Sequence, residues 1–193
     1  MKKRFLQLFL SVLIFITFIL VAYFINVKEY ILDSILFIVL IVLMNYYYDK
    51  FSFNEVSYWF IVLGMMSHNL GVLGWYNQSP FIIQYDHITH FVGFIGVGMF
   101  LYEYLKVFNK VERIIIVLLI SLGIGSLIEL IEFIGYLKLG VGDGLFYYGG
   151  IGDTGVNLRA MDAVGGGWLN TMWDLVYNLF GSLLGIVLRK IRS

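Results

Sequence analysis

The sequence contains no cysteine, one proline and only three histidines among its 193 residues. Without cysteine, the chain has no disulfide framework, no thiol nucleophile and no thiolate metal site. Only 13% of its residues are charged, whereas an ordinary soluble domain has about 25%. The formal net charge is zero, so the composition gives no indication of nucleic-acid binding. These shortages exclude a secreted disulfide scaffold, a cysteine enzyme and a basic nucleic-acid-binding domain.

Apolar residues make up 60% of the chain, more than the core of a single domain can bury. A membrane-spanning helix needs ~20 mostly apolar residues, and the apolar runs are continuous rather than alternating, which predicts helices and not a β-barrel. We therefore expect an all-α, polytopic transmembrane helical bundle that forms a single membrane domain over residues 1–193. The six expected spans are Phe5–Ile25, Ile31–Tyr48, Val56–Trp75, His87–Val107, Arg113–Leu137 and Trp168–Leu188.

The distribution of basic residues predicts the orientation of this bundle. With six spans, both termini lie on the same side of the membrane. That side holds ten of the thirteen lysines and arginines, whereas Lys28, Lys138 and Arg159 fall on the other side. Under the positive-inside rule, both termini are expected in the cytoplasm of a plasma-membrane protein.

Inserting a charged side chain into a membrane span costs roughly 2.5–3.5 kcal/mol on insertion scales. Each such residue therefore indicates a structural or functional role. The predicted topology places the polar residues of the last four spans at the same level, in the outer leaflet. Spacing also places several of them on shared helix faces, because residues three or four apart are neighbours on a helix. The residues concerned are His68 and Asn69, Asp86 and His90, Glu129 and Glu132, and Asp174 and Asn178.

The last span carries one stripe of small and polar residues: Asn170, Asp174, Asn178, Gly181 and Gly185. Small residues four apart allow a neighbouring helix to approach closely, so this stripe is expected to face protein. Gly93 and Gly96 should likewise allow a neighbouring helix to approach the fourth span closely.

Three stretches, "YDHITHF", "ELIEF" and "WLNTMWDLVYNLFGSLLG", resemble the VanZ-like membrane proteins and, more closely, YjdF-type inner-membrane proteins. The resemblance covers roughly residues 64–188. It matches the polar positions of these families to Asp86, His90, Glu129, Glu132, Asp174 and Asn178, and departs from them at Asn170, where an aspartate is usual. It implies a helical bundle in the plasma membrane and, for VanZ relatives, a link to glycopeptide resistance at the cell envelope.

Three classes of function fit these residues. In the first, a membrane enzyme acts on an envelope lipid or its headgroup, with acid/base chemistry at the six matched residues or with metal assistance. Imidazole and carboxylate ligands suit Zn, Fe or Mn, and the candidate ligands are His90, Glu132, Asp174 and His68. In the second, a transporter or receptor binds a cation or headgroup. In the third, the polar groups only join the helices, as interhelical hydrogen bonds do.

Two further expectations concern the surroundings of these residues. The glycine-rich segment Lys138–Gly167 should be a connector, or else a lid that brings Arg159 and Asp162 to the polar residues. The first two spans should support the bundle or mediate an oligomer. His87 is offset by ~100° of helix rotation from the predicted polar face, and we expect it to meet lipid headgroups.

Overall fold

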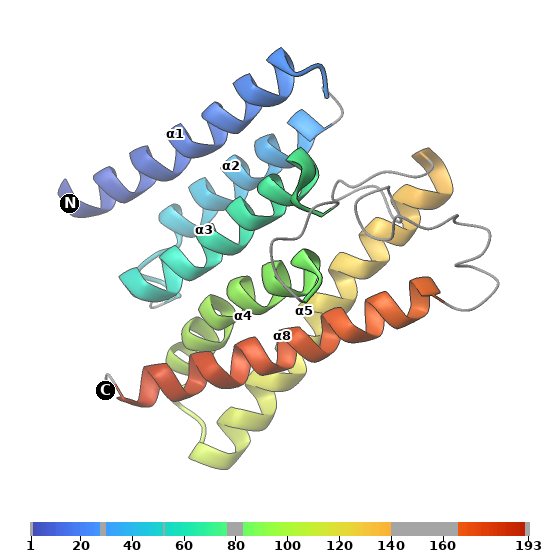
Figure 1. The fold of residues 1–193 in the computed structure, drawn as a ribbon. Helices are drawn as coiled ribbons and strands as arrows, with labels where there is room; N and C mark the ends of the chain where they lie inside the picture. Colours follow the sequence, from blue (N-terminus) through green and yellow to red (C-terminus); the bar gives the residue numbers. More distant parts are fainter. Residues whose placement is uncertain (1, 28–29, 52, 77–82, 140–165, 192–193) are drawn as a thin grey trace. The chain divides into compact units, whose positions relative to one another are not determined.

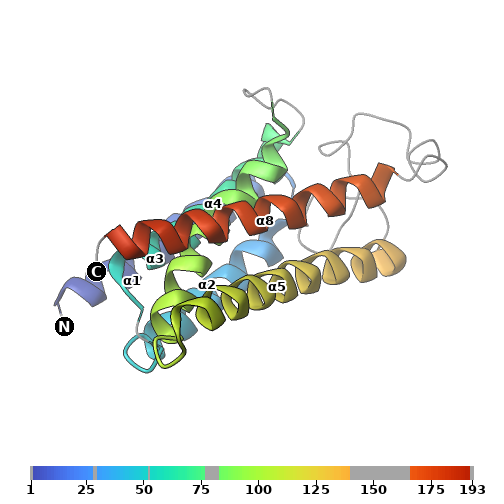
Figure 2. The same ribbon diagram turned by 90° about the horizontal axis from the view of Figure 1, so that it is seen from below.

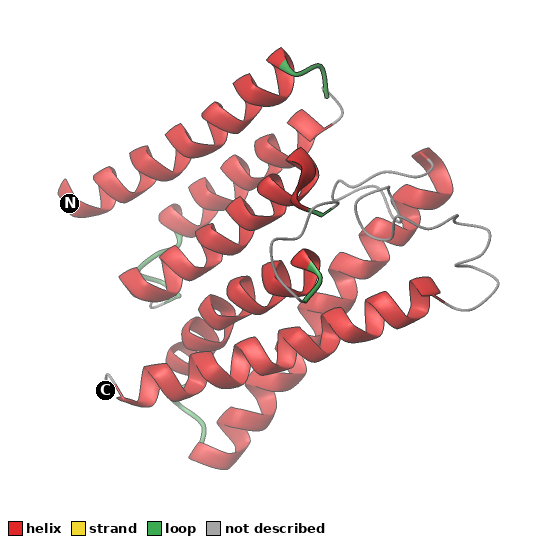
Figure 3. Cartoon of the chain, viewed as in Figure 1, coloured by secondary structure: helices red, strands yellow, loops and turns green. Residues whose placement is uncertain are grey.

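The computed structural model describes residues 2–27, 30–51, 53–76, 83–139 and 166–191. All regular elements among them are helices (Figures 1 and 3). The predicted glycine-rich connector or lid, with Arg159 and Asp162, lies largely outside the described residues. In chain order the elements are α1 (Lys2–Phe24), α2 (Ile31–Tyr46), α3 (Glu55–Leu70), η2 (Gly71–Trp75), α4 (Tyr85–Tyr104), α5 (Lys110–Leu139) and α8 (Gly166–Ile191).

Each expected span corresponds to a helix, with boundaries that differ by a few residues. Four stretches of the described chain are long and apolar enough to cross a membrane: Lys3–Phe24, Glu55–Trp75, Lys110–Gly135 and Asn170–Ile191. Helix α2 is apolar but shorter, at 16 residues. Helix α4 has 20 residues, and its first turns carry an aspartate and two histidines, which lowers its apolar character. The chain is thus a helical membrane bundle.

The chain divides into an N-terminal unit, Met1–Ser52, and a C-terminal unit, Phe53–Ser193. In the N-terminal unit, α1 and α2 pack as an antiparallel pair. The Phe15 and Phe37 rings meet edge to face at 5.6 Å. Where α1 begins and α2 ends, Arg4 donates to Asp49 at 2.7 Å and to the carbonyl of Asn45.

In the C-terminal unit, side-chain caps fix where α3 and α5 begin. The Asn54 side chain accepts from the Ser57 amide at 2.9 Å, and the Ser57 hydroxyl accepts in return from the Asn54 amide. Asn109 and Glu112 make the equivalent reciprocal bonds at the start of α5. These capping boxes satisfy backbone donors that the first helical turn leaves without partners.

The end of α3 departs from a regular helix. The chain continues into the π-helical turn η2, in which Gly74 has a φ of 125°, a conformation that favours glycine. The Tyr76 ring then folds back onto Gly71, where a Cβ atom would lie 2.3 Å from a ring carbon. This fold-back positions the Tyr76 hydroxyl over α3.

Helices α4 and α8 run parallel and in close contact (Figures 1 and 2). A Cβ on Gly181 would lie 2.4 Å from the Phe91 carbonyl oxygen, and one on Gly185 would lie 2.2 Å from that of Ile95. On its α3 side, α4 approaches Gly64 through Gly93 and Ser57 through Gly96. The glycine stripe of the last helix therefore faces protein, as predicted, and Gly93 and Gly96 lie at a close helix crossing.

Large apolar side chains cover the outer surfaces of the long helices. On α5, Leu119 and Leu127 are 62% and 61% exposed, and on α8, Phe180 is 55% exposed. Monomeric soluble proteins rarely expose continuous apolar surfaces of this kind. Lipid chains are the surroundings that these helices require.

Candidate functional site

The first turns of α4 bring Asp86, His87 and His90 toward neighbouring helices. His87 and His90 are buried, and the Asp86 side chain is 16% exposed. Asp86 lies in the first turn, where the helix dipole favours a negative charge. The start of α4 thus carries an acid and two imidazoles into the interior of the C-terminal unit.

Helix α8 presents a complementary row of polar residues to these side chains. Asp174 is 1% exposed, and its Oδ1 lies 2.8 Å from His87 Nδ1. One turn earlier, Asn170 donates to Asp174 Oδ2 at 3.0 Å and to Asp86 Oδ2 at 3.4 Å. One turn later, Asn178 is fully buried against His90. The spacing of four residues therefore places the whole row on one face of α8, which faces protein as the sequence predicts, and the structure shows that α4 lies against it.

Helix α5 adds a third carboxylate, that of Glu129. Its Oε2 accepts a hydrogen bond from the Thr171 hydroxyl at 2.9 Å. Its Oε1 is buried, has no hydrogen-bond partner among the described residues, and lies 3.7 Å from His90 Nε2. One turn before it on α5, Gly125 leaves room for Asn178, whose Nδ2 would be 2.4 Å from an added Cβ. A glycine on α5 thus permits α8 to carry a buried amide at this level.

His90 is the centre of this group of residues, which we call the α4–α5–α8 cluster: Asp86, His87, His90, Glu129, Asn170, Thr171, Asp174 and Asn178. Its Nδ1 lies 3.0 Å from Asn178 Oδ1. Because an amide oxygen only accepts hydrogen bonds, this contact places the proton on Nδ1. The opposite nitrogen, Nε2, faces Asp86 Oδ1 at 3.7 Å, Glu129 Oε1 at 3.7 Å and Asp174 Oδ1 at 4.0 Å.

These three distances are too long for hydrogen bonds, which are ~2.7–3.2 Å for nitrogen donors. They fit the ligands of a small metal ion better. Two ligand atoms about 2.1 Å from a tetrahedral ion are about 3.4 Å apart, which is close to the separations of His90 Nε2 from Asp86 Oδ1 and Glu129 Oε1. Ligand atoms of Asp86, His90 and Asp174 all lie within 4.8 Å of one another. The unpartnered Oε1 of Glu129 lies beside this group, 3.7 Å from His90 Nε2.

The charges around this centre favour a cation. In the described part of the chain, the ion-pair partners of its three carboxylates are His87 and His90, with no lysine or arginine. A carboxylate buried without a full counter-charge is strongly unfavourable. A divalent ion at the centre would supply the missing charge.

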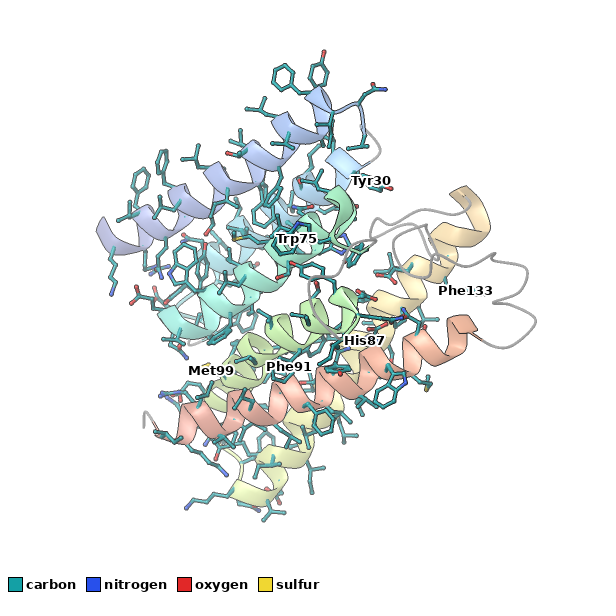
Figure 4. All side chains as sticks on the ribbon, in the orientation of Figure 1. Tyr30, Trp75, His87, Phe91, Met99 and Phe133 are labelled. Carbon is teal, nitrogen blue, oxygen red and sulfur yellow. The ribbon has the colours of Figure 1, made fainter. Side chains whose placement is uncertain are left out.

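The interpretation of His87 was wrong. Positions 87 and 90 differ by three residues, which leaves them only about 60° apart around a helix. His87 is 7% exposed, binds Asp174 and stacks on the Tyr177 ring at 4.9 Å. Figure 4 labels His87 between the ribbons of α4 and α8. Sequence reasoning also omitted Thr171 and gave Asn170 no role in binding, although the i,i+4 spacing of Asn170 and Asp174 was visible.

The other candidates occupy different surroundings. His68, on α3, pairs its Nδ1 with the Tyr76 hydroxyl at 2.9 Å, and Asn69 is buried. Glu132 is half-buried, one turn beyond Glu129. The described residues whose ligand atoms could share a metal ion are Asp86, His90 and Asp174, so His68, Glu129 and Glu132 all lie outside that group. The structure therefore brings together Asp86, His90, Glu129, Asp174 and Asn178 from three helices, and places Glu129 rather than Glu132 beside His90.

Over residues 5–193, the chain matches the model of the family described as "Predicted membrane protein (DUF2238)". No curated protein and no solved structure matches the chain.

Proposed function

The chain belongs to the DUF2238 family of predicted membrane proteins, and from that premise we propose that it is a metal-dependent membrane enzyme. Its α4–α5–α8 cluster binds a divalent cation through His90, Asp86 and Asp174, with the Glu129 carboxylate beside His90. Zn, Fe and Mn suit this mixture of imidazole and carboxylate ligands. The substrate is an envelope lipid, attacked at its polar headgroup.

One observation carries the proposal: His90 Nε2 faces three carboxylates at distances too long for hydrogen bonds. Asn178 supports it, because hydrogen bonding at Nδ1 orients the ring and leaves Nε2 for a ligand, as the outer partners of metal-binding histidines do. His87 and Thr171 hold Asp174 and Glu129 in the same way.

The setting of the cluster supports a lipid substrate. Its residues lie on helices whose outer surfaces are apolar, so lipid is the molecule that reaches them at highest concentration. The resemblance of the same motifs to VanZ-like and YjdF-type proteins supports a plasma-membrane location at the cell envelope. The charge bias that favours cytoplasmic termini would then open the cluster toward the exterior.

A structural role is the alternative with specific support. The contacts His87–Asp174 and His90–Asn178 join α4 to α8, and interhelical hydrogen bonds of this kind average about 0.6 kcal/mol. A structural role accounts for these two pairs. It does not account for the unpartnered Oε1 of Glu129.

Metal analysis of the purified protein tests the proposal. Protein purified in detergent without chelator and loaded with Zn, Mn or Fe should retain one equivalent of metal per chain. His90→Ala and Asp86→Asn should lose it, whereas His68→Ala, a matched histidine on α3, should retain it. Failure to bind any of the three metals, or retention by His90→Ala, would contradict the proposal.

Lipid turnover tests the second half of the proposal. The loaded protein is incubated with total envelope lipid extract, and headgroups are followed by mass spectrometry. A chelator-sensitive change that Glu129→Gln abolishes is expected. A metal-loaded protein that leaves every lipid unchanged would reduce the function to cation binding.

A further inference from the structure

A second concentration of charge lies at the opposite end of the C-terminal unit, where α4 and α8 end and α5 begins. Basic residues predominate here, in contrast to the α4–α5–α8 cluster. They are Lys106, Lys110, Arg113, Arg189 and Lys190, against the acids Glu103 and Glu112. The proposed metal site makes no use of this region.

Both acids of this region are already engaged. Glu103 Oε2 accepts from Arg189 at 2.7 Å and 3.0 Å, and its Oε1 lies 3.7 Å from Lys106. Glu112 accepts from the Asn109 amide and caps α5. Arg113 has no carboxylate partner among the described residues, so its positive charge is not neutralised by the protein there.

Arg113 is nevertheless held firmly in place. Its Nε donates to the Tyr102 carbonyl oxygen, and its guanidinium carbon lies 3.5 Å from the centre of the Tyr102 ring. Lys190, from α8, has its Nζ 5.5 Å from the same ring. Because Arg113 uses Nε for the backbone, its two terminal nitrogens remain as a planar fork of the kind that binds phosphate in bidentate fashion.

The surroundings of this fork are apolar, which favours a lipid over a soluble anion. Val107, Val111 and Ile191 are 83%, 67% and 76% exposed next to the basic residues. Arg113 and Lys190 also lie near the ends of the two candidate spans Lys110–Gly135 and Asn170–Ile191, at the level where headgroups are found.

We infer that Arg113 and Lys190 form a binding site for the phosphate of an anionic phospholipid. The Tyr102 ring supports both basic side chains, and the acyl chains of the lipid lie along the exposed apolar side chains. The inference is independent of the proposed enzyme function, because none of its residues belongs to the α4–α5–α8 cluster. Bound lipid would tie the end of α8 to the start of α5.

The test compares lipid retention by native mass spectrometry in a neutral detergent. Wild-type protein should retain phosphatidylglycerol in preference to phosphatidylcholine. Arg113→Gln and Lys190→Gln should each weaken phosphatidylglycerol binding by roughly fivefold, the effect expected for one basic residue at an anionic surface. Lys106→Gln is the matched control, because it removes the same charge from the same end, where the Lys106 ammonium group lies 3.7 Å from Glu103 Oε1.

Three results would overturn the inference: equal retention of the two lipids, equal loss in Lys106→Gln and Lys190→Gln, or equally strong binding of glycerol 3-phosphate, which would identify a site for soluble anions. Arg113→Lys guards against a folding defect in Arg113→Gln, because it keeps the charge and loses the fork. It should bind phosphatidylglycerol more weakly than wild type and more tightly than Arg113→Gln.

Discussion

The two ends of the C-terminal unit hold their charges in opposite ways. At the end where α5 begins, Glu103 is 21% exposed and pairs with Arg189 and Lys106, and Lys106 itself is 67% exposed. At the other end, three carboxylates with 1–16% exposure converge on one imidazole nitrogen at distances too long for hydrogen bonds. The first arrangement is typical of a membrane interface. The second is costly to bury as it stands, and a bound cation would explain why it exists.

The sharpest test of this contrast removes one acid at each end. Asp174→Ala leaves the buried His87 without its partner and removes the shorter of the two hydrogen bonds of Asn170; breaking a buried pair costs about 3–5 kcal/mol. Glu103→Ala breaks a partly exposed pair, for which about 1 kcal/mol or less is expected. Denaturant unfolding in micelles measures the decrease in unfolding free energy for each variant. Equal decreases would show that the two ends do not differ.

The next largest effect concerns the packing that brings α4 to α8. Gly185→Ala would place a Cβ 2.2 Å from the Ile95 carbonyl oxygen, and overpacking of this kind costs typically about 1–3 kcal/mol. Gly123→Ala, on α5, is the control, because nothing lies within 4 Å of its added Cβ. We expect Gly123→Ala to stabilise the protein by up to about 1 kcal/mol, the helix-propensity difference. Equal unfolding free energies for the two variants would contradict the close contact between α4 and α8.

A third change keeps the metal ligands and removes the residue that orients one of them. Asn178→Ala deletes the acceptor for His90 Nδ1. Loss of such an outer partner typically weakens metal affinity by about 10- to 100-fold, so titration should show weaker binding with unchanged stoichiometry. Ser182→Ala, one turn further along α8, is the control, since among the described residues the hydrogen bond of its hydroxyl goes to the Phe94 carbonyl, at 3.4 Å. Unchanged affinity in Asn178→Ala would leave that residue a purely structural role.

The smallest expected effect lies at the basic end. Lys106→Gln removes an exposed charge 3.7 Å from Glu103, which Arg189 continues to satisfy. A change in unfolding free energy of less than about 0.5 kcal/mol is expected. A larger loss would mean that the basic end depends on its ion pairs as strongly as the other end depends on its buried ones.

Much of this arrangement could be predicted from the sequence, because continuous apolar runs define helices and spacing defines faces. The shared face of the row from Asn170 to Gly185 follows from residues three and four apart, whereas its contact with α4 is known only from the structure. The choice of Glu129 over Glu132 could not be predicted, since both lie near the same face and the outcome depends on the rotation of α5 against α8. The π-helical turn that pairs His68 with Tyr76 depends on a fold-back at Gly74 that no helical period indicates.

The most direct test of a cation centred on His90 is the X-ray absorption spectrum of the metal-loaded protein. It should show nitrogen and oxygen neighbours at about 2.0–2.2 Å, with the multiple-scattering features of one imidazole, which disappear in His90→Ala. A shell of water oxygens without imidazole, or a spectrum that His90→Ala leaves unchanged, would contradict a metal centre at the meeting point of α4, α5 and α8.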